Sequence, residues 1–424
     1  MLTPSFNLTA TERVLPRLAL DFTTALLDSR VTFTRTTGAS NPATYVANTG
    51  NITAATNNQP RFDHNPLTLV CKGLLIEESR VNLLLQSQDF STTWTNVNST
   101  ESINVVNSPD GTQNAAKLEE TSATGNHTLQ QSLTIDLTSV NHTFSCFIKA
   151  AERTKGRISF FRTAGSFPQV RANFDLTAKT ISASGLNGAT YLAGSAFIQE
   201  YPNGWFRIGI TGFTGQSGNH VFDLYTADAS GNVSFAGTTG YGFYPWGAQL
   251  EAGAFATSYI PTTTAALTRN ADVATMTGTN FSDWFNASEG ALQINATAIS
   301  ASQFISAGSI YLDNNNYITF GFGDPNKPRL LVRNAGTFEV NTTASVAQTS
   351  PFNQCVAYKA SSISFASNTT LIVNSVNKAI PSGLNTLRIG ANPAIANSYA
   401  NAWLTKLNYW PQRLINNEVI AFSK

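Results

Sequence analysis

The chain has 424 residues and a formal net charge of +1, and only 12% of its residues are Asp, Glu, Lys or Arg. This charged fraction is about half of the roughly 25% that is usual in globular domains, so we expect neither nucleic acid nor a charged membrane as a partner. The cysteines Cys71, Cys146 and Cys355 are widely spaced and support neither a disulfide framework nor a zinc site, and no apolar run is long enough to predict a transmembrane helix.

Residues 1–85 form the first predicted unit, an irregular N-terminal segment whose turn residues are too dense for a closed core. Its phrases LDFTTALLDSRVTFTRTTGASNPATYV, PRFDHNP and KGLLIEESRVNLLL resemble the opening of the phage head spike fibre family, which are virion surface proteins of tailed bacteriophages. The resemblance implies a virion appendage that is made in the cytoplasm of a host bacterium, contacts other capsid or tail proteins and forms a homotrimer. Residues 1–19 are expected to anchor it to the particle.

The same segment carries a group of charged residues, Arg35, Arg61, Glu77, Glu78 and Arg80. One hypothesis places them in ion pairs across a symmetric interface between chains, because Arg binds carboxylates through two parallel hydrogen bonds. The alternative is a set of ordinary surface pairs that contribute little. The apolar content of GLLIEESRVNLLL favours the interface, so we expect a segment that joins chains together or to the particle and binds no small molecule.

Residues 86–265 alternate apolar and polar side chains, as in HTFSCFIKA and GWFRIGITGF, which predicts antiparallel strands with one solvated face. The phrases from NLLLQSQDFSTTWT to YGFYPWGAQLEAGAFATSYIPTTT resemble a jelly roll of the carbohydrate-binding-module type. Such jelly rolls often hold calcium between their first and last strands, and the matching positions here are Asp89 and Glu251. WGAQ replaces the usual acidic pair, however, so we expect no metal. Trp205 and Trp246 lie in apolar strand phrases and are predicted to be core.

Residues 266–282 break the strand pattern with small and polar residues and are predicted to be a linker. Residues 283–424 alternate again and resemble a laminin-G or concanavalin-type jelly roll, and their last stretch, LINNEVIAFSK, predicts a short helix. The predicted fold is therefore all-β, with two antiparallel jelly-roll β-sandwiches behind the irregular N-terminal attachment and oligomerisation segment.

No catalytic motif stands out. Glu77 and Glu78 are adjacent, and adjacent residues of a strand point to opposite faces, so they cannot flank one glycosidic bond unless a turn intervenes. The four histidines have no metal-binding spacing, and no GxSxG motif predicts a nucleophilic serine. The run Asp313–Asn316 predicts a hairpin turn in preference to a calcium loop. We expect a protein that is not an enzyme and uses no cofactor.

Sugar binding needs exposed aromatic rings, because the CH groups of a sugar stack on a ring face while its hydroxyl groups form hydrogen bonds. The candidate platforms are Trp94, Tyr244, Trp284, Tyr317 and Trp403. The predicted function is thus a structural fibre or spike of a phage virion that helps adhesion to glycans of the host surface. The alternatives are a polysaccharide depolymerase, which needs two carboxylates about 5 to 10 Å apart, and a simple lectin.

Overall fold

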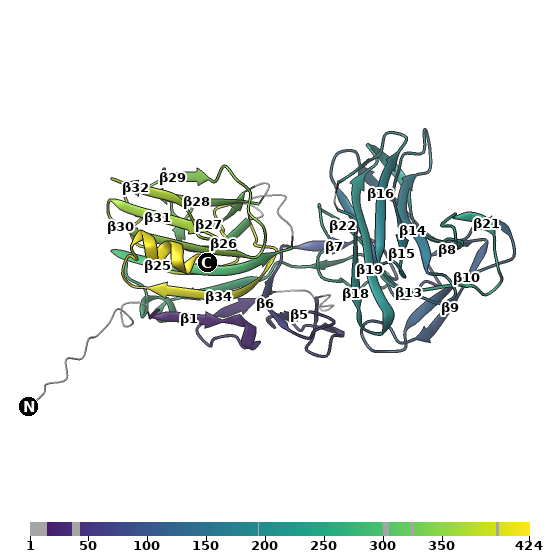
Figure 1. Cartoon of the computed structure of the whole chain (residues 1–424), viewed down its shortest axis with the longest axis horizontal. Coiled ribbons are helices and arrows are strands. Elements are labelled where there is room, and N and C mark those ends of the chain that lie inside the picture. Colours follow the sequence, from purple (N-terminus) through teal and green to yellow (C-terminus); the bar gives the residue numbers. More distant parts are fainter. Residues whose placement is uncertain (1–14, 36–42, 194, 300–304, 324–325, 396–397) are drawn as a thin grey trace, which may run out of the picture.

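The computed structural model describes residues 15–35, 43–193, 195–299, 305–323, 326–395 and 398–424, so residues 1–14 of the predicted anchor lie outside it. Two β-sandwiches lie side by side along the long axis of the molecule, and the strands of the N-terminal segment lie beside and between them (Figure 1). The all-β prediction is confirmed. Among the described residues, no helix is long and apolar enough to cross a membrane.

The first sandwich packs two antiparallel sheets over a core that includes Phe144, Ile158 and Phe222. The β17–β9 sheet has the order β17 (Thr190–Tyr191), β19 (Trp205–Phe213), β13 (His142–Ala150), β22 (Gly242–Ala252), β10 (Ala115–Glu120) and β9 (Ser99–Val106), with β18 (Phe197–Tyr201) also on β19. The β16–β8 sheet has the order β16 (Thr180–Leu186), β15 (Gln169–Asp175), β14 (Lys155–Arg162), β20 (Gln216–Thr226), β12 (Thr128–Leu137) and β8 (Thr95–Val97). A separate pair joins β11 (Thr124–Asn126) to β21 (Ser234–Ala236).

The second sandwich also has two sheets. The β32–β5 sheet has the order β32 (Thr370–Val376), β31 (Ser362–Ser367), β30 (Phe352–Lys359), β25 (Glu289–Ala298), β34 (Ala402–Trp410), β6 (Cys71–Ile76) and β5 (Phe62–His64), with β1 (Leu18–Asp21) also on β34. The β2–β29 sheet has the order β2 (Thr32–Thr34), β24 (Val273–Thr277), β33 (Thr386–Ile389), β26 (Ile305–Asp313), β27 (Asn316–Gly323), β28 (Lys327–Asn334) and β29 (Thr337–Thr343). The short helical segments are η1 (Phe22–Thr24), η2 (Pro202–Gly204), α1 (Thr279–Ser282) and α2 (Asn416–Phe422).

The N-terminal segment is not a separate unit, which corrects the predicted division at residue 85. Its strands β1, β2, β5 and β6 complete the sheets of the second sandwich, and Leu18, Phe22 and Leu74 lie in that core. Its hairpin of β3 (Thr44–Val46) and β4 (Ile52–Ala54) packs instead against the first sandwich, where Val46 and Ile52 join Trp205 and Trp246 in a buried cluster. The segment therefore belongs to both sandwiches.

The predicted linker at 266–282 is wrong as well, because it contains two strands that pair with other parts of the chain. The strand β23 (Leu267–Arg269) pairs with β7 (Arg80–Asn82), and β24 lies between β2 and β33. The sequence pattern did not reveal these strands because both are short and rich in small and polar residues. Their partners also come from distant parts of the chain.

Three local predictions are confirmed. Trp205 and Trp246 are buried core residues. Asp313 and Asn316 face each other across the turn between β26 and β27. The C-terminal helix is α2, in which Val419 is buried and the backbone N–H of Ile415 donates to Glu418 Oε2 at 2.8 Å.

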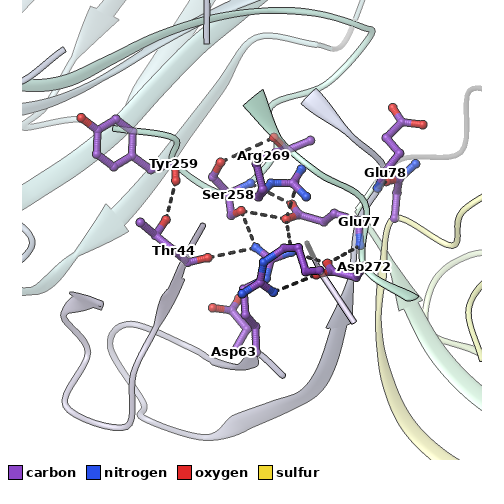
Figure 2. A network of polar contacts seen from close by, with 12 residues as sticks. Thr44, Asp63, Glu77, Glu78, Ser258, Tyr259, Arg269 and Asp272 are labelled. Atoms are coloured by element: carbon purple, nitrogen blue, oxygen red, sulfur yellow. Dashed lines mark hydrogen bonds and ion pairs between the residues drawn. The ribbon is translucent and has the colours of Figure 1, made fainter. Parts of the chain in front are cut away.

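A buried ion network joins the N-terminal segment to both sandwiches (Figure 2). Arg61 reaches Glu77 Oε2 at 2.8 Å and also contacts Asp272, while Arg35 Nη1 lies 3.0 Å from Asp272 Oδ1. Ser258, at the end of the first sandwich, donates its backbone N–H and its hydroxyl to Glu77 at 2.8 and 2.7 Å. These contacts are made within one chain, so the hypothesis of an interface between chains is wrong for Arg35, Arg61 and Glu77.

The two remaining residues of the predicted interface, Glu78 and Arg80, pair with each other within the chain at 2.5 Å and are largely buried. Glu77 and Glu78 lie between β6 and β7, and Glu78 stands apart from the network that surrounds Glu77 (Figure 2). They likewise give no support to an interface between chains.

The charges of the network are held ionised by one another. Burial alone would raise the pKa of Glu77, but the positive charges of Arg269 and Arg61, with the hydrogen bonds from Ser258, lower it to about 2 overall. Burial also acts to lower the pKa of Arg269, against the attraction of Glu77. Because each charge is out of water, the removal of one partner leaves another buried charge without compensation.

We predict that Arg61→Met lowers the free energy of unfolding by about 3 to 5 kcal/mol, because Glu77 and Asp272 lose their shared cation in a buried site. Denaturant unfolding measures the change. The matched control is Arg30→Met, which breaks a partly exposed pair with Asp28 and is expected to cost less than about 1 kcal/mol. Light scattering that found the Arg61→Met protein dissociated but as stable as the parent would restore the interface hypothesis.

Candidate functional site

The outer face of the β16–β8 sheet carries a row of polar side chains across its middle strands. Alternation turns residues such as Ile158 and Phe222 into the core and leaves their neighbours outside. We call this row the polar trough, and its members are Gln130, Arg157, Ser159, Gln169, Arg171, Asn173, Ser184, Asp223 and Tyr225. The register places them beside one another on adjacent strands.

The middle of the row is covered by its neighbours. Ser159 on β14 and Asp223 on β20 point away from the core, yet they are only 0% and 1% exposed. Exposure is greater on the neighbouring strand β15, where Arg171 is half-buried and Asn173 is exposed. The longer side chains of the row thus cover Ser159 and Asp223 and present their own polar ends to solvent.

Hydrogen bonds fix these side chains in place. Ser159 donates to Asp223 Oδ1 through a short contact and accepts from Gln169 Nε2 at 3.1 Å. Arg157 Nε donates to Asn173 Oδ1 at 2.8 Å, and its guanidinium carbon lies 5.6 Å from the centre of the Tyr225 ring. The groups are therefore held in position before any ligand arrives, which limits the entropy lost on binding.

Arg171 makes one further bond along this row, from its Nε to Ser184 Oγ at 3.1 Å. Its guanidinium still has donors to spare, since a guanidinium carries five N–H groups. Burial lowers the pKa of the neighbouring Arg157, and the positive charge of Arg171 acts in the same direction. The register sets Arg171 diagonally across from Arg157 on the neighbouring strand, so the two cations lie on the same part of the face.

Asp223 is the one carboxylate of the trough and is unusually basic. Burial raises its pKa to about 7, against the opposing hydrogen bonds of Ser159 and Tyr225 and the charge of Arg157. Its Oδ2 is buried and accepts no hydrogen bond from the part of the chain that the structure describes. At neutral pH the trough therefore carries two arginine charges and only a partial carboxylate charge, which suits a ligand with hydroxyl and carboxylate groups.

The structure corrects three of the five aromatic platforms predicted from the sequence. Trp94, Trp284 and Tyr317 are 4%, 1% and 2% exposed. Trp94 packs edge-on against Phe90, and Trp284 packs against Phe281 and Tyr409. A ring covered on its faces cannot stack on a sugar, so these three side chains are core.

The other two platforms, Tyr244 and Trp403, are half-buried and lie outside the trough. Tyr244 packs against the cluster around Trp246. Trp403 donates from Nε1 to Asp63 Oδ2 at 2.8 Å, and the Lys72 ammonium lies 4.2 Å from its ring centre. Trp403 lines a cavity of about 100 Å³ at the junction, a space for a few water molecules and far below the usual size of a ligand pocket.

The two calcium candidates serve unrelated turns. Asp89 is exposed and accepts from the backbone and hydroxyl of Ser91, whereas Glu251 is buried and accepts from Gln249 and Thr257. Within the described ranges, no group of three or more His, Cys, Asp or Glu side chains could hold a metal ion.

Sequence reasoning missed the trough because no single motif encodes it. The available signal was Asp223, a lone acid inside the apolar strand phrase HVFDLYT. An acid at such a position must either face a partner or change its pKa. Its neighbours in space, Ser159 and Arg157, come from a strand about 65 residues earlier, and only strand pairing brings them together.

The sequence matches no known protein family and no curated protein. Among solved structures, the chain is similar to the CBM40 module of Ruminococcus gnavus IT-sialidase bound to α2,6-sialyllactose, with 14% identity over 33% of this chain and 85% of that one and a TM-score of 0.28. It is also similar to domains LG4-5 of the mouse laminin α1 chain, with 10% identity over 69% of this chain and 88% of that one and a TM-score of 0.22. A third is Trypanosoma rangeli sialidase in complex with the inhibitor DANA, with 10% identity over 73% of this chain and 60% of that one and a TM-score of 0.29. Structural similarity at these identities and TM-scores supports no statement about function.

We predict that Asp223→Asn stabilises the protein at pH 8 and has little effect at pH 4. The folded-state pKa of about 7 lies above the ordinary aspartate pKa of 3.8, so the folded protein holds its proton more tightly and loses stability as the pH rises from about 4 through 7. Each tenfold change in the acidity constant is worth about 1.4 kcal/mol, which makes the full effect on the order of 4 kcal/mol. Thermal melts across this pH range measure the difference, and a constant gap between the two proteins would contradict the assignment.

Proposed function

We propose that this protein is a glycan-binding appendage of a phage virion that is not an enzyme, and that the polar trough binds an acidic polysaccharide of the host surface. The observation that carries the proposal is the row of pre-positioned polar groups on the outer face of the β16–β8 sheet, with Arg157, Arg171 and Asp223 at its centre. Arginine donors suit the carboxylates of uronic or sialic acids, and the amide and hydroxyl groups beside them suit ring hydroxyls.

The virion part of the proposal rests on the phrases between Leu20 and Leu85 that resemble the phage spike family. The neutral surface and the paired sandwiches are compatible with a stable surface protein. A homotrimer remains part of the proposal, with an interface other than the buried network. Immunogold labelling of intact particles tests the location, and light scattering of the purified chain tests the trimer.

A depolymerase is the competing function. Two-carboxylate hydrolysis needs a second acid about 5 to 10 Å from the first, whereas Asp223 is the one acid among the trough residues and Asp175, farther along the same face, pairs with Lys155. Incubation with host polysaccharide therefore should release no reducing ends. Release that was lost in Asp223→Asn would favour the enzyme instead.

We predict that Arg171→Ala weakens binding to carboxylated glycans at least tenfold, because a hydrogen bond to a charged group contributes about 1.5 to 3 kcal/mol. Binding to an array of oligogalacturonates and polysialic acid measures it. The matched control, Lys359→Ala, removes one positive charge from an exposed strand end of the second sandwich and is expected to bind as the parent does. An equal loss of affinity in both variants would show that binding depends on net charge and not on Arg171 itself.

We also predict that binding of the acidic glycan weakens as the pH rises from 6 to 8. Asp223 loses its proton in this range because its pKa is about 7, and its new charge repels the ligand. High salt should weaken binding further, since salt screens the arginines. The affinity of Asp223→Asn is expected to stay constant over the same pH range, and a drop as large as that of the parent protein would contradict the role of this side chain.

A further inference from the structure

A second site lies between the two sandwiches, outside the polar trough. It is an open cleft of about 750 Å³, within the range of small-molecule sites. Its walls come from four parts of the chain, namely residues 78–83 around β7, the turn at 140–141, the segment 252–255 after β22, and Ala271 with Tyr399 on the side of the second sandwich. The junction near β7 in Figure 1 marks its place.

Arg80 is the central polar group of this cleft. Its side chain is 8% exposed, and its guanidinium carbon lies 4.9 Å from the centre of the Phe255 ring. The guanidinium also lies directly over Gly253, where an added Cβ would come within 1.5 Å of Arg80 Nη1. The glycine is therefore needed for Arg80 to occupy this position.

The guanidinium has capacity left for a ligand. Arg80 Nη2 pairs with Glu78 Oε1 at 2.5 Å, but the buried Nε has no hydrogen-bond partner among the described residues. A buried donor without a partner costs about 1 to 3 kcal/mol. A small shift of the side chain toward the cleft would let a ligand oxygen reach Nε and remove this cost.

The charge of the cleft points to a neutral ligand. Arg80 and Glu78 cancel each other, and no further charged residue lines the cleft within the described ranges. The pair presents N–H donors beside carboxylate acceptors, and Asn141 and Ser79 add an amide and a hydroxyl. Adjacent donors and acceptors are what two neighbouring hydroxyl groups of a sugar need, because each hydroxyl both donates and accepts.

Apolar surface completes the site. Phe255 and Tyr399 offer ring edges and faces, and Val81, Leu83 and Val140 add aliphatic groups. Tyr399 is half-buried, so part of its ring remains accessible. Sugar rings have CH faces that pack on such surfaces while their hydroxyl groups bind at the edge.

We propose that the cleft between the sandwiches binds a neutral saccharide, with Arg80 and Glu78 holding a vicinal pair of hydroxyl groups and Tyr399 and Phe255 contacting the ring. The site is separate from the polar trough and takes a different class of glycan, since the trough carries net positive charge and the cleft does not. Two sites on one rigid chain would bind a polysaccharide surface more tightly than either alone.

The test uses the full chain on an array of neutral oligosaccharides, namely maltotriose, cellotriose, mannotriose and lactose, beside the acidic glycans used for the trough. Arg80→Lys and Tyr399→Ala are expected to lose neutral-glycan binding about tenfold and to keep acidic-glycan binding. Arg171→Ala, in the trough, is expected to do the reverse. Tyr191→Ala, which truncates an exposed tyrosine of the first sandwich, is the matched control and should change neither.

Thermal melts confirm that each variant is folded, and the lysine variant retains the charge that pairs with Glu78. Failure of every neutral glycan to bind the parent protein would overturn the cleft proposal and leave the trough untouched. Neutral binding that survives both cleft variants would overturn it equally, and neutral binding lost in Arg171→Ala would assign that ligand to the trough.

Discussion

The buried contact of Arg61 with Glu77 and Asp272 is the constraint on which the arrangement of the molecule depends. Each of these side chains is almost wholly removed from water, and a buried charge without a partner is strongly destabilising. Arg61 and Glu77 come from the N-terminal segment, Asp272 precedes β24, and Ser258 belongs to the end of the first sandwich. These buried charges are compensated only when the N-terminal segment, the stretch before β24 and the end of the first sandwich meet. The network therefore fixes one sandwich against the other.

Both proposed ligand sites follow from this architecture in different ways. The cleft exists because the network and the β7–β23 pair hold two rounded sandwiches in contact. The trough needs no partner domain, since the strands β12, β14, β15, β16 and β20 of one sheet set its register. One site is therefore positively charged and built on a single sheet, and the other is neutral and built at a junction. This division would let a chain of low overall charge recognise two kinds of glycan.

Much of the fold was predictable because it depends on local patterns. Period-two alternation predicted the strands of both sandwiches, and the apolar phrases around Trp205 and Trp246 predicted core. Aromatic type alone failed for Trp94, Trp284 and Tyr317, since a ring on a strand packs inward or stays exposed according to neighbours that are distant in sequence. The charged N-terminal residues were expected to pair across an interface between chains or on the surface, whereas Arg61, Glu77 and Asp272 pair in the interior of one chain.

The sequence by itself determined the class of the fold, many of the strands within residues 86–265 and 283–424, and the lack of local catalytic motifs, because alternation and motif spacing are properties of short segments. Only the tertiary structure decided that the N-terminal strands complete the second sandwich, that Glu77 is an internal ion-pair partner, and that Asp223 lies beside Ser159 and Arg157. The physical reason is that strand pairing and charge burial join residues far apart in the chain, and their energies depend on removal from water, which no local pattern records.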